Sequence, residues 1–245
     1  MAADPDSRFI TTPWTMILEA NQSHTSGPAQ GLVRLCEAYH YPVYAFIRKQ
    51  GGSADEARDL SQQFFLRLIE KKLYRRADPD HGRFRNFLLR SVKNYLINAK
   101  RDANRLKRGG GTHLVELDDD LEDHYARQND PEQLSPENLF DREWAFALFD
   151  RVWAELRSEY EALGYSERFD LLKEHILGGA DGATYADVAE QLGTDASAIK
   201  STAFRMRKRF RVLIRIAVAQ VVEDPNAVDE EIGYLIQVMS LALKS

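Results

Sequence analysis

The sequence predicts an all-α protein in which an acidic flexible linker joins two helical modules, the second of them a helix-turn-helix. Apolar residues recur at three- and four-residue spacing along most of the chain, which is the period of a helix with one buried face. No alternating pattern longer than a few residues predicts a β-strand, and no segment repeats. Basic and acidic residues are segregated, and this segregation separates the modules from the linker.

These patterns divide the chain of 245 residues into five parts. Its length is sufficient for two small domains, each with its own core. A last helix, from about Asp229, is expected to fold back on the second module. The parts are an N-terminal extension with a short helix at 14–20 (residues 1–30), the first module (31–106), the acidic linker (107–138), the helix-turn-helix module (139–222) and a C-terminal helical extension (223–245).

Composition excludes several classes of protein. Cys36 is the only cysteine, so no intramolecular disulfide can form, which fits a reducing cytosol. It lies on an apolar helical stripe and is expected to be a buried structural thiol. The first residues contain acids and no apolar run, so we expect no signal peptide. No segment approaches the roughly 18 apolar residues of a membrane helix. We therefore expect a cytoplasmic protein without membrane association.

The first module is predicted to contain three helices. The first spans residues 31–50 and ends at two glycines. The second spans residues 54–72 and begins after Ser53, which forms a capping box with Glu56 three residues later. One face of the second helix is polar. Such a face is typical of a solvated helix and also of one that recognises a basic protein surface; it carries Asp59, Gln62 and Gln63.

The third helix, residues 83–105, is basic and contains interleaved aromatic residues. The segment 83–108 holds nine Lys or Arg and one acid. Cations can neutralise phosphates, while aromatic rings and Asn side chains can stack on or hydrogen-bond unpaired bases. Alternatively, Phe84 and Phe87 belong to the core and only the charges face solvent. We expect that some of these aromatic residues are buried in the core and that others face solvent beside the charges.

The linker that follows is strongly acidic. Residues 116–143 contain eleven acids and two Arg, with little periodicity. The acids at 118–123 could bind Mg²⁺ in principle, but no scaffold surrounds them. We interpret this segment as a solvated linker or a partly ordered connector.

The second module contains the helix-turn-helix. A helix from about residue 185 to 192 ends at Gly193, and Thr194 or Asp195 can cap the next helix. From Lys200 to residue 215 there are seven Lys or Arg and no acid. This pattern is typical of a helix that enters a DNA major groove, and a solvated basic helix is the alternative. The expected buried stripe comprises Ile199, Ala203, Met206, Phe210, Leu213 and Ala217.

No catalytic centre emerges from the sequence. None of the six His lies three or four residues from another or beside Cys, so no zinc site is indicated. The common hydrolase, zinc-protease and dinucleotide-binding motifs are missing. We expect a protein that is not an enzyme and that uses no metal or cofactor.

Three segments resemble the extracytoplasmic-function (ECF) type of bacterial RNA polymerase sigma factor. DEARDLSQQFFLRLIE (residues 55–70) is similar to the family's core-polymerase-binding helix. GRFRNFLLRSVKNYLINAKR (82–101) is similar to the segment that melts and reads the −10 promoter element. YADVAEQLGTDASAIKSTAFRMRKRFR (185–211) is similar to the −35-reading helix-turn-helix. All three occur in the family's order, and the resemblance covers most of the chain.

The resemblance implies partners and a role for each matching position. The partners are core RNA polymerase, through its β′ clamp helices and β flap, and promoter DNA. An anti-sigma protein is a further partner to consider, and the free protein is expected to be a monomer. The polymerase contacts would be Asp59, Gln62 and Gln63; the −10 contacts would be Arg83, Arg85, Asn86, Asn94, Asn98, Lys100 and Arg101; the −35 contacts would be Ser197, Lys200, Ser201, Arg205, Arg207, Lys208 and Arg211.

The sequence also departs from the family pattern. Gln63 replaces a usual Glu, Phe87 replaces a usual Trp, and Thr202 stands where Arg is frequent, which removes one expected base contact. The stretch before the helix-turn-helix lacks the usual LPxxxR. Two other functions remain open from the residues: a DNA-binding regulator that dimerises through the first module and does not replace sigma, and a metal-dependent nucleic-acid enzyme that uses the acids at 118–123.

Overall fold

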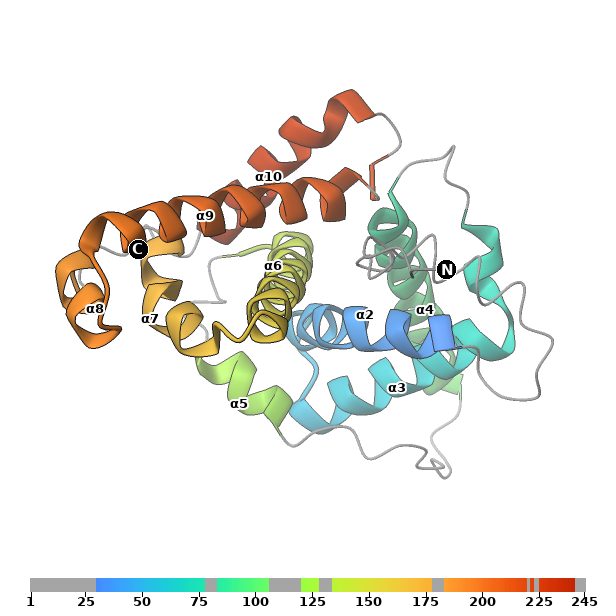
Figure 1. Ribbon diagram of the computed structural model, residues 1–245. Helices are drawn as coiled ribbons and strands as arrows, with labels where there is room; N and C mark the ends of the chain where they lie inside the picture. Colours follow the sequence, from blue (N-terminus) through green and yellow to red (C-terminus); the bar gives the residue numbers. More distant parts are fainter. Residues whose placement is uncertain are drawn as a thin grey trace. The chain divides into compact units, whose positions relative to one another are not determined.

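A computed structural model describes residues 30–77, 83–105, 120–127, 134–177, 183–219, 221–222 and 225–240 (Figure 1). All regular structure in these ranges is helical, which confirms the predicted fold class. The expected helix at 14–20 lies outside the described residues. The helices are α2 (Gln30–Lys49), α3 (Ala54–Glu70), α4 (Phe84–Arg105), α5 (Asp120–Arg127), α6 (Pro136–Ala162), α7 (Ser166–Leu177), α8 (Tyr185–Gln191), α9 (Ala196–Ala219) and α10 (Val228–Ser240), with 3-10 turns at Leu73–Arg76 and Pro225–Ala227.

The chain forms two compact units. Unit I contains the described residues between 11 and 147 together with those after 218, and unit II contains residues 148–218. The predicted parts divide the chain differently, because they place nearly all of α6 in the helix-turn-helix module and α10 in a separate C-terminal extension. The start of α6, up to Ala147, belongs instead to unit I. The expectation that the last helix folds back on the second module is wrong, since Glu231 of α10 pairs with arginines of α4.

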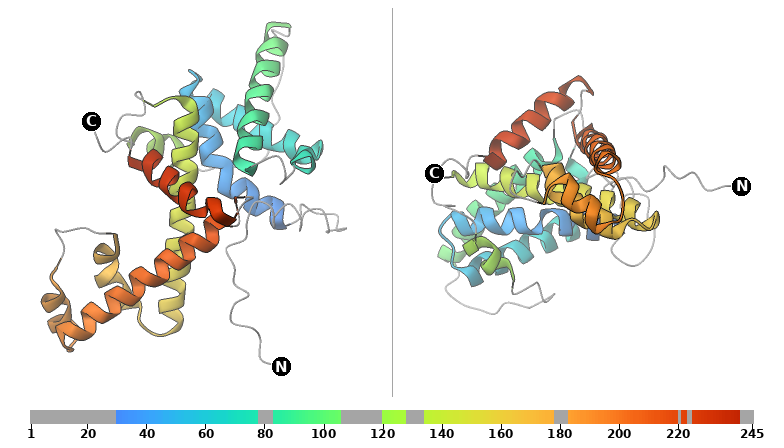
Figure 2. Two further views of the ribbon diagram at one scale, coloured as in Figure 1. Left: turned by 90° about the horizontal axis from the view of Figure 1, so that it is seen from above. Right: turned by 60° about the vertical axis from the view of Figure 1, so that its left-hand side comes forward.

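The core of unit I is built around α2. This helix packs along α3 (Figures 1 and 2) and buries apolar side chains along most of its length. The ring of Tyr39 contacts Phe84 of α4, with centroids 5.5 Å apart, and stacks on Trp144 of α6 at 6.5 Å. The Ser53 hydroxyl accepts the Glu56 amide at 3.2 Å, which caps the start of α3 as expected.

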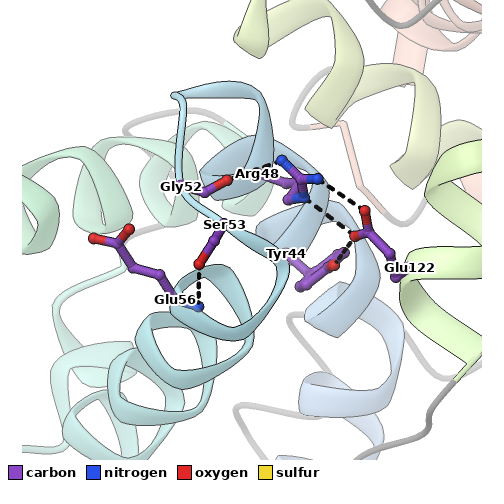
Figure 3. Close-up of polar contacts among 6 residues, drawn as sticks. All are labelled: Tyr44, Arg48, Gly52, Ser53, Glu56 and Glu122. Carbon is purple, nitrogen blue, oxygen red and sulfur yellow. Dashed lines mark hydrogen bonds and ion pairs between the residues drawn. The ribbon is translucent and has the colours of Figure 1, made fainter.

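Part of the acidic linker is an ordered helix. Glu122 of α5 accepts hydrogen bonds from the Arg48 guanidinium, at 2.8 and 3.1 Å, and from the Tyr44 hydroxyl at 2.5 Å (Figure 3). These bonds hold the pKa of Glu122 below its usual value, with the Arg48 hydrogen bond as the main cause. Leu121 is buried, and Tyr125 packs against a small apolar cluster. Residues 120–127 are therefore a docked element, and residues 118 and 119 lie outside the described ranges.

Unit II packs the end of α6, α7 and α8 against α9. Its centre is aromatic: the Trp153 ring lies 5.0 Å from Phe169 and 5.5 Å from Phe210. Figures 1 and 2 show α8 as a short helix at the N-terminal end of α9. The expected stripe of α9 from Ile199 to Ala217 is buried, because its residues face this core. Among the described residues of both units, no helix combines the length and the apolar character needed to cross a membrane.

Candidate nucleic-acid interface

A groove with a volume of about 840 Å³ lies in unit I between α3, the 3-10 turn that follows it and α4. Four of its twelve lining residues are cationic, three are aromatic and three are asparagines, and none of these twelve is acidic. The lining residues are Phe64, Arg67, Lys71, Leu73, Arg76, Asn86, Phe87, Arg90, Ser91, Asn94, Tyr95 and Asn98.

The spacing of residues along α4 creates one wall of this groove. Residues four apart lie on one face of a helix, so Asn86, Arg90, Asn94 and Asn98 form an exposed row. A second row, at positions 87, 91 and 95, is half-buried beside the first. The opposite face is apolar and fixes the helix in the core of unit I; it consists of Phe84, Leu88, Val92 and Leu96.

The other wall comes from the end of α3 and the turn after it. Arg67 and Lys71 continue the helical spacing from Phe64. Lys72 then adopts a left-handed conformation, with φ of 50°, which turns the chain into the 3-10 segment. The buried Tyr74 anchors that segment, and Arg76 reaches the groove from it.

Tyr95 is held in a defined position inside the groove. Its ring lies 5.7 Å from the Phe64 ring, and its hydroxyl donates a hydrogen bond of 3.1 Å to the Gln63 side chain. Burial raises the pKa of Tyr95, and the charge of Arg67 partly offsets this rise. The phenol is therefore neutral near pH 7, and its ring presents an aromatic surface to the groove.

This combination of groups suits a single strand of nucleic acid. Cations neutralise backbone phosphates, aromatic rings stack on bases, and asparagine amides hydrogen-bond exposed base edges. An acid-free lining imposes no local repulsion on a polyanion.

The predicted −10 residues fall into three groups. Asn86, Asn94 and Asn98 line the groove. Lys100 and Arg101 are exposed further along α4 and are not among the lining residues. The guanidinium groups of Arg83 and Arg85 form ion pairs with Glu231. Arg85 is only 2% exposed and is bonded to Glu231, so in this conformation it is not accessible to DNA, contrary to expectation.

The α3 wall of the groove was not expected from the sequence. No role was expected for Arg67, Lys71 or Arg76, which provide the cations of this wall. The basic run KKLYRR at residues 71–76 was the available signal. Its meaning depends on α3 packing beside α4, which a local pattern does not show.

The predicted polymerase-binding residues lie on α3. Asp59 and Gln63 are exposed and one helical turn apart, and Gln62 beside them is partly buried. Since Gln63 also accepts a hydrogen bond from the Tyr95 hydroxyl, it connects this face to the groove.

The turn between α8 and α9 has the expected construction. Thr184 and Asp187 form a capping box at the start of α8. Gly193 adopts a left-handed φ of 61° at the end of the helix. The Asp195 carboxylate accepts the amides of residues 197 and 198, at 2.9 and 3.0 Å, and so caps α9.

The outward face of α9 carries most of the predicted −35 residues. Two residues of this helix differ from expectation. Arg207 donates to the His175 carbonyl at 3.1 Å and to the Tyr185 hydroxyl, so it connects α9 to α7 and α8. Thr202 is buried and donates to the Ala198 carbonyl at 2.9 Å, so it does not belong to the outward face. The exposed residues are Ser197, Lys200, Ser201, Arg205, Lys208 and Arg211.

Residues 35–106 match the family model described as Sigma-70 region 2. The chain contains a sigma-70 region 2 domain. The matched residues include most of α2 and all of α3 and α4, and the whole groove lies within them. This domain indicates an RNA polymerase sigma factor, and it implies binding to core RNA polymerase and to promoter DNA. No curated protein and no solved structure matches the chain.

The region 2 match extends to no residue of unit II. Sigma factors are generally not enzymes. Among the residues that the structure describes, no group of His, Cys, Asp and Glu could hold a metal ion.

Proposed function

We propose that this protein is a sigma factor of the ECF type, which directs core RNA polymerase to promoters and initiates transcription. The observation that supports this proposal best is the acid-free groove of unit I, which lies inside the sigma-70 region 2 match. In this role the groove captures unpaired bases of the −10 element. Stacking and hydrogen bonding hold the opened strand, at about 1–3 kcal/mol per stacked base, so no ATP is needed.

Unit II supplies the upstream contact in this proposal. The exposed basic face of α9 enters the major groove of the −35 element, with Ser201 and Arg205 near base edges and Lys208 near phosphates. The capped turn and the buried stripe support this role, because they fix the helix that presents these side chains.

The polymerase contact is assigned to the exposed face of α3. Asp59, Gln62 and Gln63 bind the β′ clamp helices, and unit II reaches the β flap. The protein acts as a monomer in the cytoplasm, where core polymerase is found. An anti-sigma protein would be a further partner.

Promoter-dependent transcription by purified core polymerase tests the proposal. The full chain should produce discrete transcripts from genomic templates, and permanganate should detect unpaired thymines near the start site. Arg90→Ala, in the groove, should reduce this opening. Lys93→Ala is the matched control, because Lys93 lies on the same helix but pairs with Glu137 at 2.6 Å. The absence of promoter-dependent initiation on every genomic template would refute the function.

A further inference from the structure

The two walls of the groove in unit I carry different kinds of side chain. Three of its four cations come from α3 and the segment after it, while all three asparagines come from α4. Cations bind phosphates, whereas side-chain amides can read the edges of bases. Each wall therefore suits a different part of a nucleotide. The α3 wall carries Arg67, Lys71 and Arg76, and the α4 wall carries Asn86, Asn94 and Asn98.

The cations of the α3 wall form an exposed row. Arg67 and Lys71 are four residues apart, and side chains at this spacing on a helix have Cβ atoms about 5–6 Å apart. Arg76 follows from the 3-10 turn, which the buried Tyr74 anchors. The wall therefore presents its charges one after another along the groove. Such a row fits successive phosphates of one strand better than it fits a single anion.

Carboxylates hold several other cations of unit I. Glu122 lies 2.8 Å from Arg48, and Glu137 lies 2.6 Å from Lys93. Within the described part of the chain, the cations of the α3 wall form no such ion pair. A phosphate that binds these cations has no carboxylate of the described residues to displace.

The exposed rings of the groove belong to the α4 wall. Phe64 of α3 is buried, whereas Phe87 and Tyr95 of α4 are half-buried. The hydrogen bond from the Tyr95 hydroxyl to Gln63 fixes the direction of its ring. Asn98 is three residues from Tyr95 and is its neighbour on the helix surface. A base that stacks on this ring therefore lies beside an amide that can read its edge.

On the assignment of the groove as the single-strand interface, we propose that the strand lies with its sugar-phosphate backbone along α3 and its bases against α4. Arg67, Lys71 and Arg76 bind phosphates, and the rings and asparagines of α4 contact bases. The α3 wall then supplies affinity that depends on salt and not on sequence, while the α4 wall supplies the sequence preference.

Removal of one charge from the α3 wall tests this orientation. Lys71→Gln and Arg75→Gln each lose one positive charge, but the exposed Arg75 does not line the groove. Anisotropy measures the binding of labelled oligothymidine and oligodeoxyadenosine to each full-length variant in complex with core polymerase, as a function of salt. Compared with Arg75→Gln, Lys71→Gln should bind both oligonucleotides about fivefold more weakly at 0.1 M salt, and its slope of log affinity against log salt should be shallower by about 0.7.

Asn94→Ala is the complementary variant, on the α4 wall. It should change the ratio of the affinities for the two oligonucleotides severalfold, because an asparagine amide makes a bidentate contact with adenine and not with thymine. The slope against salt should stay the same, since no charge is lost. A changed ratio in Lys71→Gln, or a changed slope in Asn94→Ala, would overturn the orientation.

The remaining outcomes separate the orientation from the groove assignment. If Lys71→Gln and Arg75→Gln bind alike while Arg90→Ala binds more weakly than the wild type, the orientation fails and the groove assignment stands. If Arg90→Ala also binds like the wild type, both fail. A loss of affinity for core polymerase in Lys71→Gln, with an unchanged slope for DNA, would assign the α3 wall to the polymerase and overturn its role in phosphate binding.

Discussion

Replacing Tyr95 with alanine is expected to weaken capture of single-stranded promoter DNA without unfolding unit I. The ring is half-buried and contacts Phe64, and its other face is available to the groove. Base–aromatic stacking contributes about 1–3 kcal/mol per base. Since each 1.4 kcal/mol corresponds to a factor of about ten, the dissociation constant should rise about 5- to 150-fold.

Fluorescence anisotropy with a single-stranded −10 oligonucleotide, on the complex with core polymerase, measures this loss directly. Tyr95→Phe is the matched control, because it keeps the ring and removes only the hydroxyl that donates to Gln63. The partly exposed hydrogen bond contributes about 1 kcal/mol or less, so Tyr95→Phe should lose under tenfold in affinity. Circular dichroism and the Tm of each variant show whether the fold is retained.

The stacking role of Tyr95 is refuted if Tyr95→Ala binds the oligonucleotide as tightly as the wild type while its fold is intact. It also fails if Tyr95→Phe loses as much affinity as Tyr95→Ala, because the hydroxyl and not the ring would then carry the contact.

Four other outcomes are expected. Glu122→Gln should lower the stability of unit I by about 1 kcal/mol, whereas Glu70→Gln should not, in urea titrations; because the pKa of Glu122 is lowered on folding, its contribution should be complete above the unfolded pKa and disappear as pH falls through the folded pKa, and a pH-independent difference would contradict this. Arg205→Ala should weaken −35 duplex binding by about 1–3 kcal/mol and leave core binding intact, while Arg209→Ala, which loses an ion pair with Glu159, should bind the duplex normally; equal losses in the two variants would contradict the assignment. Arg207→Ala should lower the Tm of unit II, since its bonds to α7 and α8 contribute about 1–3 kcal/mol, and an unchanged Tm with weaker DNA binding would instead assign it to phosphate contact. Burial raises the pKa of Cys36 to about 12, so a thiol reagent at pH 8 should modify the partly buried thiol much more slowly in the native than in the unfolded chain, and equal labelling rates would contradict this.

The local features of this fold could be predicted from the sequence. The buried stripe of α9 follows from apolar spacing, and the turn before it follows from Gly193 and the Asp195 cap. Each of these signals acts within a few residues of its effect. The asparagines of α4 at 86, 94 and 98 were instead expected from the family resemblance, and their spacing places them on one helix face.

The remaining features depend on contacts between distant segments. The family resemblance predicts that Arg85 binds DNA, but its partner Glu231 lies 146 positions away and is not visible in that pattern. The order of α5 was missed for a similar reason, since Glu122 pairs with Arg48 across 74 positions. Arg67 became a groove residue only once α3 was placed beside α4. Local periodicity carries no information about which helices meet.

The discontinuity of unit I has a consequence for biosynthesis. A ribosome makes α2, α3 and α4 early, yet Glu231 follows all of unit II in the sequence and leaves the exit tunnel after it. Until then Arg83 and Arg85 lack the Glu231 carboxylate, and unit I is incomplete while unit II already has all its residues. A nascent chain that ends before Glu231 therefore leaves two guanidinium groups without the buried carboxylate that pairs with them in a chain that includes α10.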